Sequence, residues 1–432
     1  MLRIIRILLL LGLLLTASIA IEAQAATPTI DVLHAKGVIN PVLVDYIKRG
    51  INQAEESNAI ACIIQLDTPG GLDTSMRDIV KDIVSARVPV VVYVSPSGAR
   101  AASAGVFITM AAHIAVMAPN TAIGAAHPVA MGEEGEAAMS EAMEEKVVND
   151  AAAYIRSIAE SHGRNMEWAE QAVREAVSAT EQEALELNII DMVVPDLDAL
   201  ISQLDGRQVT MLGGAVVTLN TPGATINHIS MNNIEDFLYA ISDPNIAYLL
   251  LSLAMLGLMA EISNPGLIFP GVIGAICLLM AFFSLGVLPV NYTGILLIVL
   301  AFGLFIAEVF TTTFGLFTAG GLTSLVLGSL ILFKGGPLFQ VNPWLIATIS
   351  IIITALVAFV LNRVIRAHRR QASTGREELI GKTALVKVAL DPEGVVLFKG
   401  ERWTAISEEG RLEPGETVII TRVDGLQLYV TK

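Results

Sequence analysis

Five apolar runs, separated by short breaks, occupy residues 246–362. A run of about 18 to 25 apolar residues is long enough to cross the hydrocarbon core of a membrane as a helix. The whole chain is 53% hydrophobic, with a mean hydropathy of +0.63, a composition that ordinary soluble proteins do not have. We therefore predict about five transmembrane helices, of which the first is the least certain because it is short: 246–262, 267–289, 293–311, 314–333 and 343–362.

The first 25 residues have the pattern of a secretory signal peptide. Arg3 and Arg6 precede an apolar core, and the sequence Ala23-Gln24-Ala25 is typical of a cleavage site. An uncleaved membrane anchor is the alternative interpretation. With either one, the segment that follows is predicted to be exported.

Four arginines follow the last apolar run, at positions 363, 366, 369 and 370. Cytoplasmic ends of membrane helices carry such an excess of positive charge, so this cluster is predicted to be cytoplasmic. Five crossings from an exported domain also place the C-terminal domain in the cytoplasm. The chain is thus predicted to lie in the cell (inner) membrane. Its predicted parts are a signal peptide, an α/β domain, a linker, the membrane block, a basic linker and an all-β domain: 1–25, 26–205, 206–245, 246–362, 363–375 and 376–432.

The two domains outside the membrane block differ in pattern. Strand-like runs such as Ala59–Leu66 and Val90–Val94 alternate with amphipathic helical segments, which predicts an α/β domain with a parallel sheet. Residues 376–432 contain five short alternating runs with glycine turns, which predicts a small OB-like barrel. We assign Trp403 and Tyr429 to the core of this barrel and a protein-contact or assembly role to the domain.

Charge and cysteine content exclude several kinds of partner. The formal net charge is −15, whereas nucleic-acid binding requires a basic surface. Cys62 and Cys277 lie in separate apolar runs, and the sequence has no cluster with metal-ligand spacing. We therefore expect no disulfide, no metal and no cofactor.

Two small-residue segments are candidates for chemistry. Asp67-Thr68-Pro69-Gly70-Gly71 follows a strand-like run, and paired glycines there allow backbone N–H groups to turn toward a ligand. Gly98–Gly105 is a turn between a strand and a helix, which places Ser103 at the helix start, where N–H groups lack helical partners. Taken singly, each segment is also explained as a structural turn.

A serine nucleophile needs a neighbouring base, and two residues are candidates. Lys146 lies on a helix predicted for 140–162, on one face with Asp150 and Tyr154. A lysine accepts a proton at neutral pH only where desolvation or a nearby cation lowers its pKa. His127 lies in a loop, and an imidazole titrates near neutrality without such help. A solvated lysine and a polar loop histidine are the ordinary alternatives, and spacing alone does not choose between the two bases.

The chain resembles the long form of the NfeD family, membrane-bound serine proteases that act on stomatin-like proteins. The resemblance rests on residues 67–72, 98–105, 117–128 and 146–157, and it extends over the signal, protease, membrane and barrel segments. It implies that the α/β domain has a ClpP/crotonase-like fold, related also to signal peptide peptidase A.

The resemblance also implies roles for individual residues. Ser103 is then the nucleophile and Lys146 the general base of a Ser–Lys dyad, and the oxyanion hole comes from Gly70 or Gly71 together with the amide of Ala104. His127 falls where the ClpP branch has its catalytic histidine, so it remains the alternative base.

The expected substrate is a hydrophobic segment of a stomatin- or prohibitin-like membrane protein. Other expected partners are membrane lipid and further copies of the chain, in a homodimer or a higher homo-oligomer. A non-catalytic scaffold that organises stomatin-like proteins is the main alternative. A crotonase-like acyl-CoA enzyme is a second alternative, disfavoured by export to a compartment without CoA.

Overall fold

The computed structural model describes the whole chain except residues 1–27, 129–140, 265, 267, 312–314 and 370–378. The predicted signal peptide therefore lies outside the described residues. The chain divides into two compact units, Met1–Ile306 with Ala319–Ser350 and Ala307–Thr318 with Ile351–Lys432.

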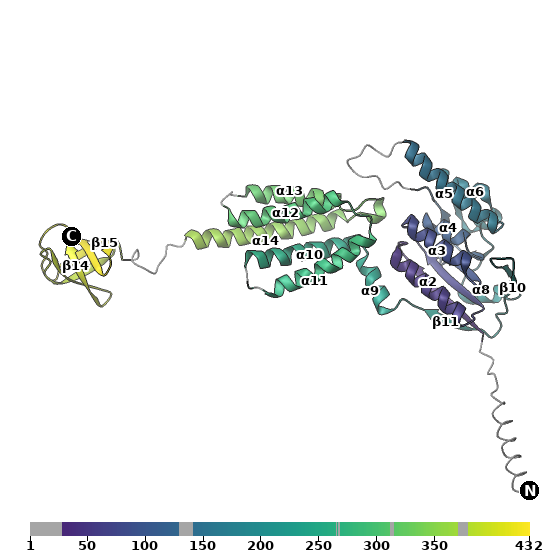
Figure 1. The fold of residues 1–432 in the computed structure, drawn as a ribbon, viewed down its shortest axis with the longest axis horizontal. Coiled ribbons are helices and arrows are strands. Elements are labelled where there is room, and N and C mark those ends of the chain that lie inside the picture. Colours follow the sequence, from purple (N-terminus) through teal and green to yellow (C-terminus); the bar gives the residue numbers. More distant parts are fainter. Residues whose placement is uncertain (1–27, 129–140, 265, 267, 312–314, 370–378) are drawn as a thin grey trace, which may run out of the picture. The chain divides into compact units, whose positions relative to one another are not determined.

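The first unit contains a six-stranded sheet (Figure 1) in which every neighbouring pair of strands is parallel. A parallel sheet is covered on both faces, so its strands are apolar throughout rather than alternating. All five residues of β3 are buried, as this requires. The spatial order is β11 (Thr225–Ile229), β1 (Thr29–Lys36), β2 (Ala61–Asp67), β3 (Val90–Val94), β5 (Ile114–Met117) and β8 (Met192–Val193).

Two apolar cores lie on opposite faces of this sheet. Along β3, Val90 and Val92 belong to the larger core, whereas Val91 and Tyr93 belong to the smaller one. The smaller core packs against α8 (Leu197–Leu204) and β9 (Gln208–Thr210), which pairs with β10 (Val216–Thr218). The larger core is covered by α2 (Pro41–Glu56), α3 (Asp73–Ser85), α4 (Ala104–Met110), α5 (Glu141–Ser161) and α6 (Met166–Arg174).

The stretch predicted as a linker, 206–245, is not a free connection, because part of it joins the parallel sheet. β11 pairs with β1 from Thr29 to Leu33 and extends the sheet, and α9 (Asn233–Ile241) follows it. Within β11 only Ile229 is buried. An edge strand of this kind lacks the continuous apolar run by which the other strands were predicted.

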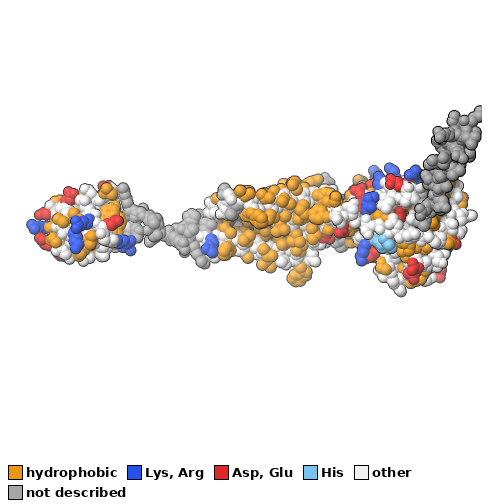
Figure 2. Space-filling view, turned by 90° about the horizontal axis from the view of Figure 1, so that it is seen from below, with side chains coloured by type: hydrophobic (Ala, Val, Ile, Leu, Met, Phe, Trp, Pro, Cys, Tyr) orange, Lys and Arg blue, Asp and Glu red, His pale blue; other side chains and the backbone are white. Residues whose placement is uncertain are grey.

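The membrane block contains five apolar helices, and hydrophobic side chains predominate on the face seen in Figure 2. Four helices of the described chain are long and apolar enough to cross a membrane. The shorter fifth is α13, not the first run: α10 begins at Pro244, capped by Asp243, and so gains length. The five are α10 (Pro244–Ser263), α11 (Ile268–Val287), α12 (Tyr292–Phe310), α13 (Leu316–Leu330) and α14 (Pro343–Arg369).

The second unit contains the predicted C-terminal barrel, which is closed. Trp403 packs against its core as predicted. Tyr429 does not belong to that core: its ring lies under the guanidinium of Arg422, 4.0 Å from the ring centroid. The α/β, membrane-helix and barrel parts of the predicted fold class are confirmed. The barrel strands, in spatial order, are β12 (Thr383–Val388), β13 (Glu393–Phe398), β14 (Glu401–Ser407), β16 (Gln427–Thr431) and β15 (Thr417–Asp424).

A buried arginine closes the far end of α4. The Arg164 guanidinium, which is 4% exposed, donates hydrogen bonds to the carbonyl oxygens of Met110 and Ala112 and pairs with Asp191 at 2.9 Å. Carbonyl groups at a helix C-terminus lack helical partners. Arg164 therefore fixes the end of the short helix that begins beside Ser103.

Two histidines lie against this arginine. His113 and His162 meet edge to face, with ring centroids 6.4 Å apart. The Nδ1 atom of His113 accepts a hydrogen bond from the N–H of Val90. Burial, then the neighbouring His162 and Arg164, lower the pKa of His113 to about 4, so the folded domain holds this imidazole neutral.

We expect the α/β unit to lose stability as the pH falls from about 6.5 to about 4. Below pH 6.5 the unfolded chain protonates His113 but the folded chain does not, so the unfolded state binds more protons and the loss reaches about 3 kcal/mol. Labelling of the fully buried Cys62 thiol, in a Cys277→Ser background with urea, measures this unfolding. His113→Gln should reduce the difference between pH 7.5 and pH 5, and an unchanged difference would contradict the assignment.

Candidate active site

The two candidate segments meet because they follow neighbouring parallel strands. β2 pairs with β3, so both strands end at the same edge of the sheet. Beyond this edge Thr68 pairs with Ala101 of β4 (Arg100–Ala102). β4 pairs in turn with β6 (Ala122–Gly124), which pairs with β7 (Ser178–Thr180). A small second sheet therefore carries the serine turn to the glycine turn.

Ser103 lies between β4 and α4 with a positive φ of 54°. Such a backbone conformation costs a residue other than glycine of order 1–3 kcal/mol. It is fixed by a hydrogen bond from the Ser103 N–H to the Gly124 carbonyl (3.0 Å) and by one from the Val106 N–H to the Ser103 carbonyl. The side chain does not cap α4. A sharp strand-to-helix turn that presents a serine in this way is typical of serine nucleophiles.

Gly70 lies directly against this serine. A Cβ atom at Gly70 would lie 2.7 Å from the Ser103 Cβ and 3.1 Å from its Oγ, and φ at Gly70 is +116°. The Gly70 N–H donates to the Thr68 hydroxyl at 3.0 Å. The glycine is thus required by both the turn and the close approach of the serine.

In the peptidase that the family resemblance implies, Gly70→Ala is expected to lower cleavage at least about 100-fold, because the new methyl group displaces Ser103 and small displacements of reacting groups have effects of this size. Gly98→Ala is the matched control. Gly98 also has a positive φ, but a Cβ atom there meets nothing within 4 Å. Rates of purified variants on one peptide provide the measurement, and equal losses in both variants would contradict the role of the close approach.

The other two predicted oxyanion residues occupy the same region. Gly71 packs against the backbone of Ile39, where a Cβ atom would lie 2.2 Å from the Ile39 carbonyl oxygen. Ala104 is the first residue of α4, so its N–H belongs to the first turn, which lacks helical acceptors. Gly70 therefore contacts Ser103 directly, Ala104 follows Ser103 in the chain, and Gly71 follows Gly70 and packs on Ile39.

Lys146 lies near the start of α5, and its side chain is exposed. One turn further along, Asp150 pairs with Arg77 of α3 at 2.6 Å. The Arg77 guanidinium also lies 4.5 Å from the ring centroid of Tyr154. These contacts hold α5 against α3, the helix that begins two residues after Gly71. Among the hydrogen bonds of the described residues, none joins the lysine to the serine.

His127 is half-buried, three residues after the carbonyl that receives the Ser103 N–H. Its Nδ1 atom lies 2.8 Å from the Val173 carbonyl oxygen. A carbonyl only accepts, so Nδ1 carries the proton and Nε2 of the neutral ring is an acceptor. In the described part of the chain this ring, too, makes no hydrogen bond to the serine. The hydrogen bonds of the described residues therefore do not choose between Lys146 and His127 as the base.

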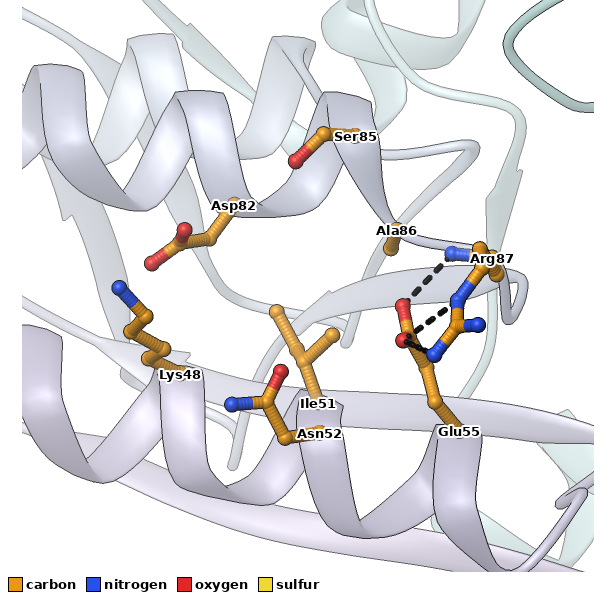
Figure 3. A pocket seen from close by; sticks show the side chains of 8 residues that line it. All are labelled: Lys48, Ile51, Asn52, Glu55, Asp82, Ser85, Ala86 and Arg87. Carbon is orange, nitrogen blue, oxygen red and sulfur yellow. Dashed lines mark hydrogen bonds and ion pairs between the residues drawn. The ribbon is translucent and has the colours of Figure 1, made fainter.

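A separate hollow lies between α2 and α3 (Figure 3). Arg87 and Glu55 pair at 2.6 Å at one end of it. Its lining comes from the later turns of both helices, whereas the glycine turn precedes α3, so it is not the predicted site. The lining residues are Lys48, Ile51, Asn52, Glu55, Asp82, Ser85, Ala86 and Arg87.

Two residues that shape the site have no predicted role in the sequence analysis. The Thr68 hydroxyl, fully buried, accepts from the Gly70 N–H and donates to the Gly70 carbonyl. Ile39 acts through its backbone: its N–H donates to the Gly70 carbonyl, and its carbonyl accepts from Leu72. Thr68 lies inside the candidate motif, but no side-chain pattern reveals a residue such as Ile39.

Comparisons with known proteins cover all three parts of the chain. Residues 29–205 match the NfeD1b N-terminal domain, 245–363 the NfeD integral membrane domain, and 376–432 the NfeD-like C-terminal, partner-binding domain. Membrane-bound protease PH1510 of Pyrococcus horikoshii is 39% identical over 93% of this chain and 92% of its own length. Membrane protein NfeD1b of Bacillus subtilis is 26% identical over 98% of this chain and 97% of its own length.

Among solved structures, the 1510-N membrane protease of Pyrococcus horikoshii, specific for a stomatin homolog, is 34% identical, with a TM-score of 0.44; the match covers 50% of this chain and 99% of that one. Fold and site define the class: an integral membrane protein with a serine-bearing α/β domain and a C-terminal barrel. The chain belongs to the NfeD family. Its similarity to PH1510, a membrane-bound protease, supports a peptidase activity for this chain.

Proposed function

We propose that the chain is a membrane-bound serine endopeptidase with Ser103 as nucleophile and Lys146 as general base. The observation that carries the proposal is the contact between Gly70 and Ser103, at a serine whose φ is positive. Lys146 takes the proton of the Ser103 hydroxyl while the serine oxygen attacks a peptide carbonyl. The protonated lysine then donates to the leaving amine, and water releases the acyl group.

The tetrahedral oxyanion is bound by backbone N–H groups. Because the Gly70 N–H already donates to Thr68, the donors are those of Gly71 and Ala104. Each donor of this kind typically lowers the barrier by about 3 to 4 kcal/mol. Gly70 contributes the space that lets Ser103 approach.

The substrate is a hydrophobic segment of a stomatin- or prohibitin-like membrane protein, as the family resemblance implies. The α/β domain is followed directly by α9 and the first membrane helix, α10. Substrate and site therefore meet at the membrane surface. We further propose a homodimer, an exported α/β domain and a cytoplasmic barrel. For the α/β domain and the barrel to lie on opposite sides of the membrane, the chain between them has to cross an odd number of times. The four long helices give four crossings, so the short α13, about 22 Å long, has to cross as well.

Covalent labelling tests this proposal. The full-length chain in detergent micelles is treated with a fluorophosphonate and digested, and the labelled peptide is mapped. We expect the label on Ser103 and cleavage of an apolar peptide that the label prevents. A label on another residue would overturn the nucleophile.

A non-catalytic scaffold for stomatin-like proteins is the second candidate. It is favoured by the match of residues 376–432 to a partner-binding domain. The same experiment separates the two functions: a scaffold binds its partner but shows neither labelling of the serine nor cleavage.

A further inference from the structure

Tyr239 of α9 holds the end of β1. Its hydroxyl lies 2.9 Å from the Lys36 carbonyl oxygen and 3.2 Å from that of Val38, so its single proton is shared between the two acceptors. Gly37, between them, has φ +101°, and a Cβ atom there would lie 2.5 Å from the tyrosine oxygen. Burial raises the pKa of Tyr239 to about 12, so the hydroxyl stays protonated and remains a donor.

The backbone held by Tyr239 is the one that supports the glycine turn. The Gly37 N–H donates to the Asp67 carbonyl at 2.8 Å, and the Ile39 N–H donates to the Gly70 carbonyl at 2.9 Å. On the opposite side the turn meets Ser103, at the contact described above. Displacement of residues 37–39 therefore moves the turn relative to the serine.

α9 is itself anchored on two sides. On the side of α2, Glu235 pairs with Arg49 at 2.7 Å. Toward the membrane helices, the Ile241 carbonyl accepts a hydrogen bond from the Ser284 hydroxyl of α11 at 2.6 Å. Asp243 then caps α10. The helix whose Tyr239 holds the backbone beside the glycine turn is thus bonded to the membrane helix α11.

We propose that Tyr239 is a positioning residue through which the juxtamembrane helix α9 aligns the glycine turn with Ser103. This inference rests on the proposed endopeptidase function. The oxyanion donors act on the tetrahedral intermediate more than on the bound peptide. Loss of alignment therefore lowers kcat and leaves KM unchanged.

The test uses the full-length chain in detergent micelles with Tyr239→Phe, which removes only the hydroxyl. We expect kcat to fall about fivefold, as for the loss of one hydrogen bond, with KM within about twofold of the parent. A peptide boronate forms a tetrahedral adduct with a serine, so its inhibition constant should rise by the same factor. Tyr93→Phe is the matched control, because that hydroxyl also donates to a carbonyl, that of Val194 at 2.8 Å, within the opposite core.

Tyr239→Phe kinetics equal to those of Tyr93→Phe, or a change in KM alone, would overturn the inference. If the parent chain cleaves the peptide and this cleavage depends on Ser103, the proposed endopeptidase function still stands. If the parent chain shows no such cleavage, both the proposed function and the inference about Tyr239 fail. If Tyr239→Phe lowers folding yield, Gly37→Ala provides a second approach, because its methyl group meets the tyrosine oxygen. The double variant should then lose less than the sum of the two single losses, and strict additivity would contradict the coupling.

Discussion

Replacing Ser103 by alanine is expected to lower peptide cleavage by the full-length chain by about 10⁴-fold or more, the size of loss seen when a catalytic serine is removed. The reason is chemical, since alanine has no oxygen with which to form the acyl-enzyme. The substitution should leave the fold intact, because the Ser103 side chain does not cap α4. Cleavage of one apolar peptide, measured with equal amounts of folded protein, provides the number.

Ser97→Ala is the control for this loss. Ser97 directly precedes the segment Gly98–Gly105, and its hydroxyl accepts a hydrogen bond from the Asn120 amide at 3.2 Å. We expect its rate within about twofold of the parent, in line with the small effects of most surface substitutions. Protection of the buried Cys62 thiol shows whether each variant is folded. Residual cleavage by Ser103→Ala at the parent rate would refute the proposed nucleophile.

The meeting of the glycine and serine turns was predictable from the sequence because the decisive signals are local. Ala61–Asp67 and Val90–Val94 are recognisable buried strands, and parallel strands end at one edge of a sheet. Small residues at Gly70 and Gly105 then allow close approach: a Cβ atom at Gly105 would lie 2.7 Å from the Thr68 methyl carbon. Sequence and structure agree where side-chain size decides the geometry.

The remaining features depend on contacts between residues far apart in the chain. β11 joins the sheet through backbone hydrogen bonds of a mostly exposed strand, so hydropathy does not reveal it. Ile39 likewise supports Gly70 through its backbone. Tyr239 reaches Lys36 across some two hundred residues of sequence separation. Such interactions leave no periodic pattern in the sequence.

Lys146→Ala is expected to lower cleavage by about 10²- to 10⁴-fold, the usual contribution of a general base. Lys146→Arg should be as inactive, because arginine keeps the positive charge but does not lose its proton in proteins. The arginine variant thereby separates proton transfer from a merely electrostatic role. Rates at several pH values, with the same peptide as for Ser103→Ala, provide the measurement.

His127→Asn is the matched variant for the alternative base. The asparagine amide retains an N–H group for the Val173 carbonyl, with which His127 now bonds at 2.8 Å, but it has no basic nitrogen. With Lys146 as base, this variant keeps at least about a tenth of the parent rate. With a histidine base, it would lose at least about 100-fold. That pattern, with Lys146→Ala still active, would assign the role of general base to His127. Lys146 would then be an exposed residue of α5 without a part in the reaction.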